Sequence, residues 1–163
     1  MYETVTQRNG AGTMLTNTFV TGGDAIFTVE VPPAFQATLN SKPHYTFRVR
    51  RSKPTPQFPT PALFVSLLAG PDNTRDYQYL GMLNDTTGEA RVTGKSKFTP
   101  DSVPVRLLNR VLAKVWANDH AAFQAHGFQL HHEGKCGCCK RRLTTPESIE
   151  RGIGPECWKK MGL

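Results

Sequence analysis

The sequence lacks any long apolar segment. No run among its 163 residues approaches the roughly 18–20 apolar residues that a membrane-spanning helix needs. The N-terminus has no basic stretch followed by an apolar run, so we expect neither a signal peptide nor a membrane partner. Hydrophobic residues make up only 38% of the chain, which predicts a modest core. These absences favour a cytoplasmic protein.

The common catalytic motifs are also absent. The chain has no phosphate-binding Gly-Lys-Ser/Thr loop, no Gly-x-Ser-x-Gly elbow and no His-Glu-x-x-His helix. His131-His132-Glu133 spells half of a zinc deaminase signature, but Cys136 follows too closely, and Lys135 stands where that signature has proline. We therefore expect that the protein is not an enzyme.

Cysteine is missing from the first 135 residues and then becomes dense. All four cysteines, Cys136, Cys138, Cys139 and Cys157, lie near the C-terminus. In a reducing cytoplasm such a cluster favours a bound metal ion over disulfides. A segment this short buries too little apolar surface to fold by itself, so the ion would supply the missing stability.

The cysteine spacing suits zinc. Cys136 and Cys139 form a Cys-x-x-Cys pair, in which a tight turn presents two sulfurs to one ion. Cys157 follows Pro155, a residue that favours the first turn of a helix, where the helix dipole stabilises a thiolate. A turn followed by a ligand at a helix N-terminus resembles the treble-clef-like zinc fingers.

The fourth ligand has three candidates. We prefer His132, with His131 and then Cys138 as alternatives, because the consecutive side chains of Cys138 and Cys139 diverge. Four protein ligands leave no coordination position for water, so we expect a structural Zn²⁺ ion.

The residues between and after these cysteines carry a family resemblance. Leu143-Thr144-Thr145-Pro146-Glu147-Ser148-Ile149 follows the cysteine pair, and Gly152-Ile153-Gly154-Pro155-Glu156-Cys157 completes the pattern. The segment from Cys136 to Cys157 resembles a short zinc-binding domain of unknown function that recurs at the C-termini of phage and actinobacterial proteins. Lys140 departs from the glycine usual there. The resemblance implies a metal site, a phage or mobile-element origin and hence the cytoplasm of a bacterial host, but it implies no activity.

The first two thirds of the chain predict an α+β fold. In 44–51, Tyr45, Phe47 and Val49 alternate with polar residues, the pattern of a half-buried strand. Further strands are predicted at 25–31, 62–69, 77–83 and 90–98, and an amphipathic helix at about 102–117. Short turns between consecutive strands favour a mainly antiparallel sheet, covered by that helix and followed by the small zinc finger.

This organisation predicts three parts. They are an irregular N-terminal segment over 1–23, a β-rich domain over 24–127 and a zinc-binding C-terminal domain over 128–163. The sequence does not indicate an oligomeric state.

A formal net charge of +7 makes nucleic acid, DNA or RNA, the first candidate partner. One group of cations surrounds the cysteines and another lies on the strand 44–51, and both suit phosphate contacts. The candidate residues are Lys135, Lys140, Arg141, Arg142, Arg151, Lys159, Arg48, Arg50 and Arg51. Trp158 lies among them, but we expect it to pack in the small core under the zinc.

The alternative is a protein-interaction module. A phage factor of this size, without catalytic motifs, would bind a host protein and inhibit or redirect it, in host takeover or against host defence. The proline-rich stretch 52–61 would present a docking surface.

Overall fold

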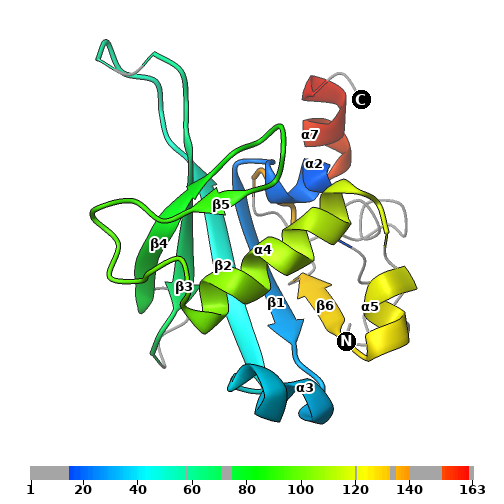
Figure 1. The fold of residues 1–163 in the computed structure, drawn as a ribbon. Coiled ribbons are helices and arrows are strands. Elements are labelled where there is room, and N and C mark those ends of the chain that lie inside the picture. Colours follow the sequence, from blue (N-terminus) through cyan, green and yellow to red (C-terminus); the bar gives the residue numbers. More distant parts are fainter. Residues whose placement is uncertain are drawn as a thin grey trace.

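The structure, a computed structural model, describes residues 15–57, 59–70, 75–119, 121–132, 135–139 and 152–161. It confirms the α+β class: one curled antiparallel sheet of six strands, with a cysteine cluster near the C-terminus (Figure 1). The strands are β1 (Asp24–Glu30), β2 (His44–Arg51), β3 (Leu63–Leu68), β4 (Tyr77–Leu83), β5 (Ala90–Arg91) and β6 (Gln129–His132). The helices are α2 (Asn17–Val20), α3 (Pro33–Leu39), α4 (Val103–Trp116), α5 (Ala121–His126) and α7 (Pro155–Lys160).

The predicted alternation in β2 is confirmed, because Tyr45, Phe47 and Val49 are buried and their neighbours are not. The register places Phe27 of β1 opposite Phe47, with ring centroids 5.8 Å apart. Since successive side chains of a strand point to opposite faces, this alternation gives the sheet one apolar face. We call it the inner face, and the opposite one the outer face.

The strands follow the order β5-β4-β3-β2-β1-β6. The first five strands form a meander, and β6 pairs antiparallel with the other side of β1. The strand predicted at 90–98 was too long, because only Ala90 and Arg91 pair with β4. A tight turn follows, in which the Ser96 amide donates to the Thr93 carbonyl over 3.0 Å.

Helix α4 lies across the inner face (Figure 1) and falls within the range predicted for a helix. Its Asn109 side chain joins it to β5: the amide oxygen accepts from the Ala90 amide over 2.7 Å, and the amide nitrogen donates to the Ala90 carbonyl over 3.0 Å. The helix buries Val105, Leu107, Leu108, Val111, Leu112 and Val115.

Helices α2 and α3 were not predicted. Of the predicted irregular segment 1–23, residues 1–14 lie outside the described residues. In the rest of that segment, Thr16 caps α2 by accepting from the Phe19 amide, and Leu15, Phe19 and Val20 enter the core. Such a short helix carries little sequence signal of its own and depends on this packing. No helix in the described ranges is long and apolar enough to cross a membrane.

The boundary predicted between residues 127 and 128 lies just before the last strand of the sheet. Strand β6 begins at Gln129 and pairs with β1, with His132 opposite Phe27 and Leu130 opposite Val29. The chain that leads to the cysteines is therefore already part of the sheet.

Candidate metal centre

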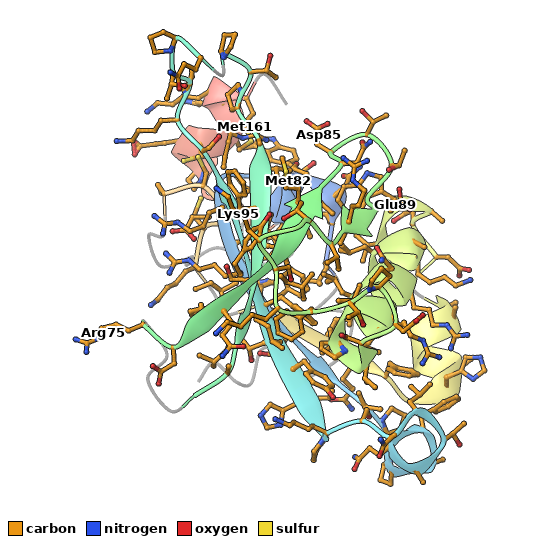
Figure 2. All side chains as sticks on the ribbon, turned by 60° about the vertical axis from the view of Figure 1, so that its left-hand side comes forward. Arg75, Met82, Asp85, Glu89, Lys95 and Met161 are labelled. Atoms are coloured by element: carbon orange, nitrogen blue, oxygen red, sulfur yellow. The ribbon has the colours of Figure 1, made fainter. Side chains whose placement is uncertain are left out.

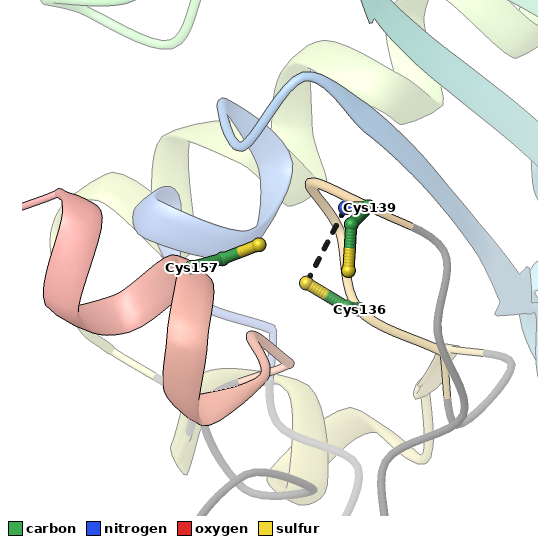
Figure 3. Close-up of side chains that lie close together, drawn as sticks. All are labelled: Cys136, Cys139 and Cys157. Atoms are coloured by element: carbon green, nitrogen blue, oxygen red, sulfur yellow. Dashed lines mark hydrogen bonds between the residues drawn. The ribbon is translucent and has the colours of Figure 1, made fainter.

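Three cysteine side chains meet near the C-terminus. The Sγ atoms of Cys136, Cys139 and Cys157 all lie within 4.8 Å of one another (Figure 3). Tetrahedral zinc with Zn–S bonds of about 2.3 Å holds its sulfurs about 3.8 Å apart. The three thiols therefore need to move inward by only a small distance to bind one ion.

The Cys136–Cys139 turn directs backbone donors at Cys136. The amides of Cys138 and Cys139 donate to its Sγ over 3.3 Å and 3.5 Å. Burial acts to raise the pKa of Cys136, but the backbone donors of Gly154, Cys139 and Cys138 outweigh it and lower the pKa to about 7. Because the thiolate is the form that binds metal, these donors prepare Cys136 as a ligand.

Cys157 lies in the first turn of α7, which begins at Pro155 after Gly154. Burial, together with the neighbouring thiols of Cys139, Cys138 and Cys136, raises the pKa of Cys157 to about 12. The metal-free cluster thus combines a cysteine that ionises readily with one that keeps its proton. A bound cation would reverse this at Cys157, because coordination removes the thiol proton.

Backbone hydrogen bonds hold the cysteine turn against the sheet. The Gly137 carbonyl accepts from the Asp24 amide at the start of β1 over 2.7 Å. The Gly137 amide donates to the Gly152 carbonyl over 2.8 Å, which joins the turn to the approach of α7. The Phe19 ring packs so closely on Gly152 that a Cβ there would overlap it, and Gly152 has a φ of +76°. Glycine is therefore required at this position by both space and conformation.

The segment has a core of its own, but a small one. Cys136, Ile153 and Cys157 are buried, with Trp158 and Met161 packed against them. Trp158 thus packs where we expected it, beside the cysteines.

The candidates for the fourth ligand differ in position. His132 is buried, at 4% exposure, with its ring 5.2 Å from that of Phe19, and it is not a member of the three-cysteine group. His131 is on the outer face, where its Nε2 lies 2.6 Å from a carboxylate oxygen of Glu30. Cys138 is exposed and also outside the group, and its thiol contributes to the raised pKa of Cys157.

The predicted cations that the structure describes separate into three sets. Arg48 forms a two-point ion pair with Asp24, over 2.8 Å and 2.9 Å. Arg50 and Arg51 are exposed, and Arg51 donates to the Thr21 carbonyl over 2.8 Å. Lys135 and Lys159 beside the cysteines are exposed, as is Lys160. The remaining predicted cations, Lys140, Arg141, Arg142 and Arg151, lie outside the described residues.

Sequence comparison adds one finding to this geometry. Comparisons with curated proteins and with solved structures found no significant match. The expectation of a C-terminal domain of unknown function is confirmed, and the cysteine cluster within it is compatible with a metal site. The similarity is confined to the end of β6, the cysteine turn and α7. Residues 131–162 match the family of unknown function DUF6011.

Proposed function

We propose that this is a small, basic, phage-type protein that binds nucleic acid in the cytoplasm of a bacterial host, with a structural zinc ion in its cysteine cluster. One observation carries the proposal. A hollow of about 410 Å³ is lined by Thr21 and Gly22, by Arg51 and by Met161. Arg51 at the end of β2 thus shares the hollow with Met161, the residue after α7, in which Lys159 and Lys160 are exposed.

Two cationic groups that are far apart in the sequence therefore lie at one end of the molecule. The net charge of +7 supports the same partner, because a polyanion gains most from a surface on which cations converge. Asp85 also lines the hollow, so the cations would contact phosphates around it and not within it.

Fluorescence anisotropy with labelled DNA and RNA tests the binding. The association constant should fall steeply between about 50 mM and about 200 mM salt, because bound phosphates release counterions. The double variant Arg51→Gln, Lys159→Gln should weaken binding and flatten the salt dependence. Arg106→Gln on α4 is the matched control, since Arg106 is exposed away from the hollow. Absence of binding by the wild type at low salt would refute the proposal.

The zinc proposal depends on the three sulfurs and on the backbone donors to Cys136. A ligand turn followed by a ligand in the first turn of α7 supports a treble-clef-like finger. For the fourth ligand we propose Cys138, whose thiol raises the pKa of Cys157, in preference to His131, which contacts Glu30.

Elemental analysis and cobalt substitution test this assignment. The purified protein should contain one zinc per chain. Cys138→Ser should lower the affinity for the metal ion and change the absorption of the cobalt-substituted protein, whereas His132→Gln should leave the cobalt spectrum unchanged. The reverse pattern would assign the fourth position to His132, and zinc-free protein would refute the site.

A second candidate function is supported by the β2–β3 loop. Residues 53–57, 59 and 60 are exposed, and the loop projects well beyond the sheet (Figure 1). Four prolines stiffen it, which reduces the entropy lost when a partner protein binds. A host protein that is captured after nuclease treatment, and lost when the loop is replaced by glycine and serine, would establish this role.

A further inference from the structure

The outer face of the sheet differs sharply from the inner one. On β3, Leu63, Val65 and Leu67 point inward and are buried. Phe64 points the other way and is 36% exposed, the one large hydrophobic side chain so exposed among the residues that the structure describes. Single exposed apolar residues are common on protein surfaces, so the neighbours of this ring decide whether it belongs to a binding site.

Cations flank this ring on both sides. The strand registers place Arg50 opposite Phe64, Phe64 opposite Met82, and Met82 opposite Arg91. These four residues form a row across the outer face from β2 to β5, and both arginines are exposed. Figure 2 looks toward the β4 side of the sheet and labels Met82 and Lys95 there.

A second aromatic ring lies beside Phe64. The Tyr79 ring is 6.1 Å from it, at an interplanar angle of 57°. The Tyr79 hydroxyl is hydrogen-bonded to that of Thr93 over 2.9 Å, and the Ser96 hydroxyl donates to the Tyr79 carbonyl over 3.4 Å. The Tyr79 ring is therefore held in place before any ligand arrives, and the turn that holds it carries the exposed Lys95.

The acidic groups of this face are mostly engaged away from the rings. Asp24 pairs with Arg48, whose guanidinium also lies 5.7 Å from the centre of the Tyr77 ring. Glu30 contacts His131 on the far strands. Glu89 shares a small pocket with Met82 and Arg91, at one end of the row. The surroundings of Phe64 and Tyr79 are thus positive.

We propose that the outer face binds single-stranded nucleic acid, with bases stacked on Phe64 and Tyr79 and with phosphates on Arg50, Arg91 and Lys95. This inference rests on the proposed nucleic-acid binding and names the form of the partner. Rings and cations lie side by side on this face, an arrangement in which bases can stack on the rings while phosphates contact the charges. A single strand offers both exposed base faces and regular negative charges, while a duplex keeps its base faces stacked.

The test compares single strands with a duplex. Labelled oligo-thymidine, oligo-uridine and the matching DNA duplex are titrated with the full chain at low salt. Phe64→Leu keeps an apolar side chain but removes the ring, and it should weaken single-strand binding about tenfold while duplex binding changes little. Phe64→Tyr should retain the wild-type affinity. The two single-stranded probes distinguish DNA from RNA.

Ultraviolet cross-linking followed by mass spectrometry gives a measurement that needs no variant. The cross-linked peptides should contain Phe64 or Tyr79. Unchanged single-strand binding by Phe64→Leu, or cross-links confined to the cysteine segment, would overturn this inference and leave nucleic-acid binding intact. If the wild type bound none of the probes, both proposals would fail together.

Discussion

The sheet and the cysteine segment are held together by different means. The core of the sheet draws on all six strands and on α2 and α4, with Phe27, Phe47 and Leu108 fully buried. In the described part of the cysteine segment the buried apolar side chains are those of Cys136, Ile153 and Cys157, and hydrogen bonds through Gly137 attach this part to the sheet. Hydrophobic burial suffices for the first region, whereas the second requires the sheet as a support and, on our proposal, a metal ion.

The largest effect should come from the core of the sheet. Phe47→Ala would leave a cavity against Phe27 and lower the free energy of unfolding by about 3–5 kcal/mol. Both regions should unfold together in urea, because the cysteine turn is attached to β1. Phe64→Ala, the same change on the outer face, is the control and should lower stability less, by about 1 kcal/mol.

Removing the metal should separate the two regions. With a strong chelator, or with Cys157→Ser, we expect the amides of residues 135–139 and 152–161 to exchange rapidly while β2, β3 and β4 stay protected. Hydrogen exchange with mass spectrometry measures both regions in one sample. Chelator added to Cys157→Ser should cause no further change. Loss of protection throughout the sheet would show that the regions are not separable.

A smaller effect should follow from the contact between the regions. Gly152→Ala would place a Cβ against the Phe19 ring at a φ of +76°, which should weaken docking of the segment by about 1–3 kcal/mol. Zinc affinity and local exchange measure the loss. Gly94→Ala is the matched control, because a Cβ at Gly94 meets no atom within 4 Å.

The smallest effect concerns pH. Cys157, with a pKa of about 12, must release a proton on metal binding throughout the neutral range. Because of this group, zinc affinity should fall about tenfold for each unit by which the pH is lowered. Cys136 has a pKa of about 7 and adds the same dependence only below that pH, where it becomes protonated. The plot of log affinity against pH should therefore steepen by about one as the pH falls through about 7. Competition with a chromophoric chelator measures it, and a constant slope would contradict the geometry at Cys136.

Strong local patterns made much of the sheet predictable. Strand β2 coincides with the range 44–51, and its alternation is strict because one face is buried and the other is not. The helix period over Val103–Trp116 was also readable, since the side chains that pack on the sheet recur at helical spacing. The strand predicted to Phe98 failed because Thr93 and Ser96 bind Tyr79 instead of continuing the ladder.

Other features carry no local signal. Strand β6 contains His131 and His132, and from the sequence it was interpreted as a connection to the cysteines. It forms a strand because β1 offers an unpaired edge to it. Arg48 looked like a phosphate ligand, but its cross-strand position places it against Asp24. The preference for His132 as a ligand depended on its closeness in sequence to Cys136; the structure buries its ring 5.2 Å from that of Phe19, and its role as a ligand stays a prediction.

The sequence by itself determined the α+β class, the apolar face of the sheet and the cysteine set near the C-terminus, because periodicity and ligand spacing are local properties of a chain. Only the tertiary structure decided that the cysteine turn is hydrogen-bonded to β1, that two cationic groups share one end of the molecule, and that Phe64 lies between two arginines. These facts depend on strand register and on contacts between distant segments, which no local pattern encodes.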